Sequence, residues 1–327
     1  MPCCLSHETI SGGNALSAKA IKNIGASVRQ RLLNKARQEN RPFQELLQYY
    51  AMERFLFRLS VSSFADRFIL KGALLLRVWH APLARQTMDI DMLGNTGNAP
   101  ESITTIIRQV LAVEKQGDGI VFDPESIIVE PITEDADYEG LRIRFRGDLD
   151  AARLTIQLDI GFGDKVYPDP VKESLPSLLN FPQAELYCYS RQSMIAEKFE
   201  VMAKLGILNS RMKDFYDIWM LSRQYDFEGA SLAEAIRQTF AQRGTTLVQM
   251  KKIFSGEFIE EKQVQWNAFR KRIGLEYLPA SFADVVQQVQ VFLFPAVDAL
   301  RAKRFFKDNW IAPDSWRSSH EKPEVGA

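Results

Sequence analysis

The stretch FILKGALLLRVWHAPLARQTMDIDML, residues 68–93, decides the fold of this 327-residue chain. It opens with a short apolar run, breaks at Lys71-Gly72 and continues into an apolar segment, 73–79, that we expect to be a helix. Over residues 88–93, apolar and acidic side chains alternate with the period of a β-strand. The pattern therefore predicts a strand, a glycine turn, a helix and a second strand.

Two carboxylates stand on one face of the second predicted strand, because Asp89 and Asp91 are two residues apart. Asp159 lies near the end of another alternating segment, 152–161. Carboxylate oxygens are the ligands that Mg²⁺ prefers, and a third carboxylate on a neighbouring strand can complete a two-metal site. Gly72 has no Cβ, so the backbone there can approach phosphate oxygens. The order of these features favours nucleotidyl transfer, whereas Asp-x-Asp alone is a common pattern and Asp159 alone fits a surface residue at a strand end.

The rest of the chain shows clear helical and strand periodicity. We expect helices near residues 25–38, 43–60, 101–113, 191–205, 211–224, 231–242, 258–272 and 281–306. We expect further strands near residues 120–130, 141–147 and 152–161. The predicted class is α+β, with a poorly ordered start over residues 1–16 and a frayed tail from Ala312 onward.

Charge is balanced overall but not locally. The chain has 41 Lys and Arg and 41 Asp and Glu, so a protein-wide basic field for nucleic acid is absent. Residues 19–58 carry nine basic and three acidic side chains, whereas residues 89–150 carry fourteen acidic and five basic ones. A basic segment beside an acidic centre suits an enzyme that acts on phosphates. Solvated helix faces explain the same segment equally well.

Cysteine and histidine usage excludes several classes of protein. Three cysteines, two of them adjacent, do not make a disulfide framework, and neither they nor three histidines suggest a zinc site.

No apolar run approaches the roughly 18 residues of a membrane helix, and the first residues do not have the pattern of a secretory signal. We expect a cytoplasmic protein with no membrane contact.

The stretch from Phe68 to Leu93 resembles the signature of nucleotidyltransferase toxins of the AbiEii/AbiGii type, in the superfamily of DNA polymerase β and the CCA-adding enzymes. The family pattern is Lys-Gly-Gly, a helix, then Arg-x-Ser/Thr-x-Asp-x-Asp, and it falls on Lys71, Gly72, Arg85, Thr87, Asp89 and Asp91. A second family segment matches Glu197-Lys198 and residues 211–217. The resemblance covers about residues 63–225.

The resemblance implies a division of the chain and a set of site residues. It implies N-terminal helices over 1–62, a mixed-sheet nucleotidyltransferase core over 63–190 and a C-terminal helical domain over 191–327. The implied Mg²⁺ ligands are Asp89, Asp91 and Asp159, and Asp159 can instead act as a base toward the acceptor hydroxyl. The implied contacts to a nucleoside triphosphate come from Lys71, Gly72, Ala73, Arg85, Thr87 and Lys198. Lys198 and Asp214 complete the implied catalytic set, with Lys198 on phosphate and Asp214 orienting Lys198 or the acceptor.

Some positions depart from the family pattern or allow two roles. Ala73 replaces the second glycine, and Gln157 replaces a lysine that commonly precedes the third carboxylate, which puts in doubt how well the nucleotide is held. Arg85 can pair with Asp89 and Asp91, bind substrate phosphate, or brace its loop. The basic and aromatic run over 301–307 fits either RNA contact or a helix end.

The resemblance implies the toxin component of a bacterial toxin–antitoxin or phage-defence pair. Such an enzyme transfers a nucleoside monophosphate (NMP) from a nucleoside triphosphate (NTP) to an RNA acceptor such as a tRNA 3′ end, and it has a cognate antitoxin as partner. Three alternatives stay open at this point. They are transfer to a protein hydroxyl, nucleotide binding by a degenerate core without turnover, and an interaction protein whose acidic strand is incidental.

Overall fold

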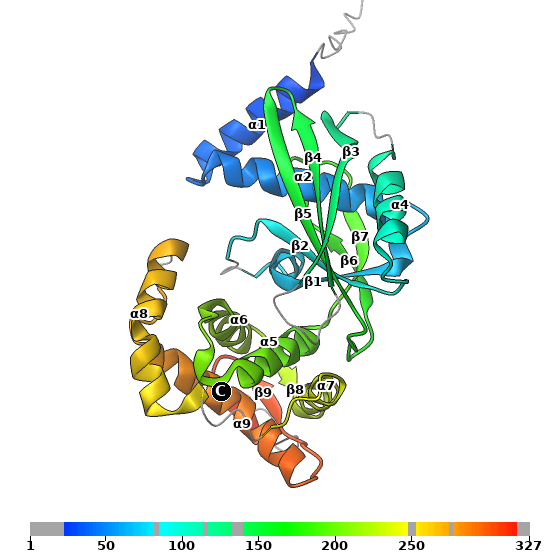
Figure 1. Ribbon diagram of the computed structural model, residues 1–327. Helices are drawn as coiled ribbons and strands as arrows, with labels where there is room; N and C mark the ends of the chain where they lie inside the picture. The colour runs from blue at the N-terminus through cyan, green and yellow to red at the C-terminus, as the bar shows by residue number, and fades with distance from the viewer. Residues whose placement is uncertain are drawn as a thin grey trace, which may run out of the picture.

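The computed structural model describes residues 23–81, 85–113, 117–132, 140–247, 253–274 and 277–318. The expectations for residues 1–16 and for the last residues of the tail lie outside these ranges. In Figure 1 the long strands and the N-terminal helices form one part of the molecule, and the C-terminal helices gather beside the lower end of the sheet.

A seven-stranded mixed sheet forms the centre, in the order β3-β4-β5-β2-β1-β7-β6. Its strands are β1 (Phe68–Lys71), β2 (Asp89–Gly94), β3 (Ile120–Pro131), β4 (Gly140–Leu149), β5 (Ala152–Phe162), β6 (Val171–Leu175) and β7 (Ala184–Cys188). Strand β2 runs parallel to β5 and antiparallel to β1, and β1 runs parallel to β7. The α+β, mixed-sheet prediction is confirmed. Strands β6 and β7 were not predicted, because each has only five residues and mixes apolar with charged side chains.

One face of the sheet is covered by α2 (Phe43–Ser60), which packs on β5 and β7. Phe55 of this helix lies 4.9 Å, between ring centroids, from Phe145 of β4. Register across β4, β5 and β2 places Ile90 near this apolar layer, and Ile90 is fully buried. The helices α1 (Ile24–Gln38) and α4 (Pro100–Leu111) pack on α2, and α4 also packs on β3. The opposite face of β2 is therefore the one that carries its acidic side chains.

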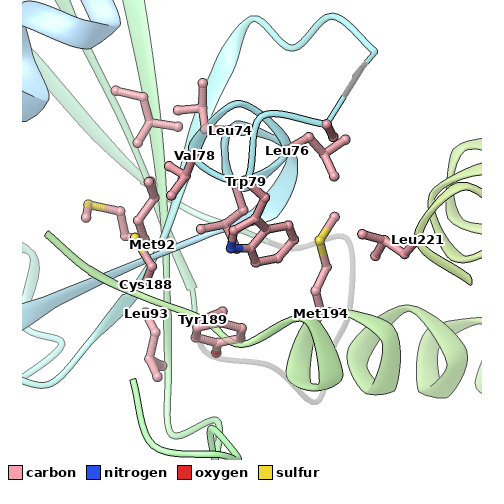
Figure 2. Packing of buried hydrophobic residues seen from close by; sticks show 14 of the residues in the cluster. Leu74, Leu76, Val78, Trp79, Met92, Leu93, Cys188, Tyr189, Met194 and Leu221 are labelled. Atoms are coloured by element: carbon pink, nitrogen blue, oxygen red, sulfur yellow. The ribbon is translucent and has the colours of Figure 1, made fainter. Parts of the chain in front are cut away.

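The helix expected at 73–79 is shorter than predicted. A 3₁₀ turn at Gly72–Leu74 leads into the single-turn helix α3 (Leu75–Val78), and His80 then adopts a positive φ of 52°. The apolar side chains of this segment fill a junction. Figure 2 shows Trp79 in the middle of that junction, between the sheet and the helix that carries Met194.

The C-terminal part contains α5 (Arg191–Leu205), α6 (Met212–Gln224), α7 (Gly229–Gln242), α8 (Gly256–Ile273) and α9 (Phe282–Arg301). The helix expected at 281–306 ends at Arg301. The tail is not frayed over residues 312–318, because β9 (Asn309–Ile311) and β10 (Ser315–Arg317) form a small sheet with β8 (Phe227–Glu228). Trp316 stacks on Phe292, which holds the tail on α9. No helix in the described ranges combines the length and apolar character needed to cross a membrane.

The orientation of β2 gives a stability prediction. Ile90→Ala should lower the free energy of unfolding by about 2–4 kcal/mol, because it removes a fully buried side chain. Met88→Ala should change it by less than about 0.5 kcal/mol, because Met88 is 47% exposed. Urea unfolding monitored by circular dichroism measures both values, and equal losses would contradict the burial of Ile90 in the layer beneath α2.

Candidate active site

Four charged residues stand in one row across four neighbouring strands. Strand register pairs Arg142 with Asp159, Asp159 with Asp91, and Asp91 with Lys71. Residues that are directly paired across strands project from the same face of a sheet, so all four side chains share the face turned away from α2. Asp89, two residues before Asp91, belongs to the same face.

The three aspartates of this face come together as the sequence predicts. Asp89, Asp91 and Asp159 each offer a carboxylate oxygen within 4.8 Å of the others. Among the described residues, no other group of three or more His, Cys, Asp or Glu side chains is close enough to hold a metal. The hydroxyl of Thr87 donates to Asp89 Oδ1 at 2.5 Å and fixes that carboxylate. An all-oxygen, anionic set of this kind fits a hard divalent cation such as Mg²⁺.

Like charges and burial perturb Asp91. Burial and, after it, the charge of Asp89 raise the pKa of Asp91 to about 6, although Lys71 acts in the opposite direction. Because the pKa of Asp91 is raised in the folded protein, its protonated form contributes stability to the fold. That contribution is fully present below the ordinary pKa of 3.8 and is lost as the pH rises through about 6. The metal-free fold therefore carries an electrostatic cost near neutral pH that a bound cation would offset.

Gly72 is required by its contact with Asp91. Its φ is +70°, a region that other residues rarely adopt, and a Cβ at this position would overlap the Asp91 carboxylate. The glycine turn thus makes room for one carboxylate of the acidic group (Asp89, Asp91 and Asp159). Ala73, at the family's second glycine, is 4% exposed.

Lys71 forms ion pairs with two further acids, Asp164 and Glu197. Its ammonium lies 3.0 Å from Asp164 Oδ2 and 3.5 Å from Glu197 Oε1. Both of these acids also contact Arg243 at the end of α7. Burial raises the pKa of Glu197. Asp164 follows the end of β5, and its role was not predictable from the sequence because its partners lie far away in the chain.

Arg142 is the neighbour of Asp159 that the sequence did not reveal. Its guanidinium donates to both carboxylate oxygens of Asp159, at 3.0 Å and 2.8 Å, in bidentate geometry. The amide of Gln157 also donates to Asp159, at 3.4 Å, so the residue that replaces the family's lysine still contacts the third carboxylate. Arg142, Arg144 and Arg146 alternate with apolar residues in the sequence. The partner of Arg142, however, depends on the order of the strands in the sheet, which the sequence does not show.

A second charged network joins the acidic face to the C-terminal helices. Lys198 of α5 lies 3.0 Å from Asp214 and 2.6 Å from Asp217, both on α6. Arg85 donates to both oxygens of Asp217, at 2.9 Å and 3.0 Å, and Arg211 donates to Asp214 at 2.7 Å. Arg85 therefore braces the segment before β2 against α6, rather than pairing with Asp89 and Asp91 as one of its expected roles required.

The network favours its charged forms. Burial alone would raise the pKa of Asp214 and Asp217, but the adjacent cations outweigh it and hold both values below the ordinary range. The pKa of Lys198 is raised, although burial acts in the opposite direction, because both aspartates stabilise its charge. Asp217, the last residue of the second family segment, joins Arg85 to Lys198.

Comparison with known proteins identifies the family. The family model for the nucleotidyl transferase AbiEii toxin of type IV toxin–antitoxin systems matches residues 54–288. This chain belongs to the AbiEii family. The resemblance seen in its motifs is confirmed, and the protein is a nucleotidyltransferase. No curated protein matches the chain.

Two solved structures from Helicobacter pylori are similar to this AbiEii-family protein. One, titled as JHP933, is 13% identical with a TM-score of 0.46, covering 80% of this chain and 97% of its own. The other, titled as a putative nucleotidyltransferase, is 14% identical with a TM-score of 0.44, covering 80% of this chain and 98% of its own.

The contact between Arg142 and Asp159 predicts an effect on metal affinity. A guanidinium bound to both oxygens competes with a cation for the carboxylate, so Arg142→Gln should tighten Mn²⁺ binding about threefold to tenfold at neutral pH. Arg146→Gln is the matched control on the same face of β4, where Arg146 pairs with Asp123. Isothermal titration measures both variants. Weaker binding by Arg142→Gln than by the control would contradict the competition.

The raised pKa of Asp91 predicts a pH dependence. A carboxylate must lose its proton to bind a metal, so Mn²⁺ binding should weaken as pH falls through about 6 and should release a proton in that range. Titration calorimetry in two buffers of different ionisation enthalpy measures the affinity and the released proton. An affinity that stays constant between about pH 5 and about pH 7.5 would show that Asp91 does not titrate as described.

Proposed function

We propose that this AbiEii-family enzyme transfers an NMP from a Mg²⁺-bound NTP to an RNA acceptor such as the 3′ end of a tRNA. One observation carries the proposal: three carboxylates converge on one face of the sheet within 4.8 Å, and Arg85 ties the segment that leads into them to the cationic network around Lys198. Carboxylates for cations and cations for phosphate are the two requirements of phosphoryl chemistry.

The acidic group would hold the metal. Asp89, Asp91 and Asp159 would bind Mg²⁺, which supplies charge neutralisation at the transferred phosphoryl group. Thr87 orients Asp89 for this task, and Gly72 keeps the space that Asp91 occupies. Asp159 offers a carboxylate oxygen within 4.8 Å of those of Asp89 and Asp91, so we favour the ligand role over the base role for Asp159.

The triphosphate would meet the cationic network. Lys198 has two of its three N–H donors directed at Asp214 and Asp217, and its side chain is 12% exposed. The third donor is available for a phosphate oxygen, while the two aspartates fix the ammonium. Arg85, held by Asp217, sets the position of the segment that leads to Asp89. Lys71 adds positive potential at Asp91, and the backbone at Gly72 and Ala73 would lie along the triphosphate.

Two further proposals follow from the family. A toxin of a type IV toxin–antitoxin system implies a cognate antitoxin, which we propose as the partner of this chain. We also propose that the enzyme works in the cytoplasm, where nucleoside triphosphates, Mg²⁺ and RNA acceptors occur together.

Radiolabelled transfer tests the proposal. Wild-type protein incubated with labelled NTPs, Mg²⁺ and total RNA should produce labelled RNA, and Asp89→Ala should lower the rate at least about a hundredfold because it removes a metal ligand. Asp148→Asn is the control, since Asp148 is an exposed carboxylate at the far end of β4 that pairs with Arg153. Circular dichroism checks that both variants fold.

Digestion of the product separates the alternatives. Label that resists ribonuclease and yields to protease would assign the acceptor to protein and overturn the RNA proposal. Transfer by Asp89→Ala at the wild-type rate would show that the acidic group does not carry the reaction. Nucleotide binding by the wild type without any transfer would favour a degenerate core, in line with Ala73 and Gln157.

A further inference from the structure

A cavity of about 670 Å³ opens at the edge of the sheet where β2 begins. Its wall includes Arg85, Gln86 and Met88, and Met88 immediately precedes the metal-binding candidate Asp89. Other walls come from α2, from the end of α3, from α6 and from the last turn of α8. The cavity is thus built between the sheet side and the C-terminal helices, and it begins where β2 begins.

The ionisable residues that line the cavity are mostly cations: Arg41, Arg77, Arg85, Lys213 and Arg272, with Glu45 as the one carboxylate. Arg41 is already paired with Glu45, and Arg85 with Asp217. Within the described ranges Arg77, Lys213 and Arg272 form no ion pair. Three positive charges from three different helices therefore face the same space without a carboxylate partner, which is the electrostatic character of an anion-binding site.

Aromatic rings support two of these cations. The Arg77 guanidinium lies 4.5 Å from the centre of the Tyr49 ring, and the Arg272 guanidinium lies 5.6 Å from the centre of the Phe269 ring. A guanidinium held over a ring keeps N–H groups at its edge for phosphate oxygens, and it offers a planar surface for stacking. Planar cations and aromatic rings in one groove are the features by which proteins hold single-stranded nucleic acid.

Lys213 connects the cavity with the carboxylates. It precedes Asp214 on α6, lines the cavity, and its charge lowers the pKa of Asp91. Burial and then the charge of Arg211 lower the pKa of Lys213 itself. An anion in the cavity would reduce the repulsion among these positive charges, and its binding would change the electrostatic potential at the acidic group.

We propose that this cavity is the acceptor subsite, where the terminal phosphodiesters of a single-stranded RNA 3′ end bind so that its last hydroxyl reaches the acidic group. The inference rests on the proposed function and deepens it. A triphosphate is compact, and the metal site and Lys198 already match its charge. Unpaired cations from α3, α6 and α8, spread around a space of about 670 Å³, suit successive phosphates along a strand instead.

RNA binding in the absence of NTP tests the subsite. Fluorescence anisotropy with a short labelled single-stranded RNA should show binding about threefold to tenfold weaker for each of Arg77→Gln, Lys213→Gln and Arg272→Gln. The slope of log affinity against log salt should fall by about 0.7 for each lost phosphate contact. Lys271→Gln is the matched control, because Lys271 is the exposed neighbour of Arg272 on α8 and does not line the cavity.

The same variants distinguish the possible failures. If all three bind RNA as Lys271→Gln does, with unchanged salt slopes, while the wild type labels RNA from NTP, the acceptor subsite is refuted and the proposed function stands. If the three variants lose NTP binding and keep RNA binding, the cavity is a nucleotide site and the inference is wrong. If the wild type labels only protein, the proposed RNA acceptor fails, and the subsite fails with it.

Discussion

Repulsion among three neighbouring carboxylates is the constraint on which the rest of the structure depends. The parallel pairing of β2 with β5 sets Asp91 directly beside Asp159, with Asp89 on the same face. The surrounding residues partly compensate this negative charge. Arg142 pairs with Asp159, Lys71 lowers the pKa of Asp91, and the turn at Gly72 leaves room for the Asp91 carboxylate. A half-buried group of three carboxylates costs stability unless a cation shares it, which is why we interpret it as a metal site in a nucleotidyltransferase.

The C-terminal helices contribute to the site through one continuous charged network. Asp217 accepts from Arg85 on the segment before β2 and from Lys198 on α5, so three elements distant in sequence are fixed together. Two buried aspartates with three cations leave positive charge directed at the acidic face. The same arrangement explains why the proposed acceptor cavity begins at β2 and yet has α6 and α8 in its walls.

Local patterns in the sequence predicted the parts of the site that are local in the chain. The alternation around Asp89 and Asp91 fixed their shared face, and helical periodicity placed α1, α2 and α5–α8 within a few residues. Contacts between distant residues were not predictable. The pairing of Arg142 with Asp159 depends on strand order, and the partner of Arg85 lies 132 residues away on α6. The helix expected at 73–79 is present as a 3₁₀ turn followed by the single turn of α3, and its apolar residues fill the junction around Trp79.

The most direct test of a shared metal site is a crystal structure of the wild-type protein grown with Mn²⁺, with anomalous difference maps. The account predicts an anomalous peak at about 2.2 Å from oxygens of Asp89, Asp91 and Asp159, with the Arg142 guanidinium withdrawn from at least one oxygen of Asp159. Crystals that bind Mn²⁺ elsewhere, while Arg142 keeps both contacts to Asp159 and the acidic group stays empty, would contradict it.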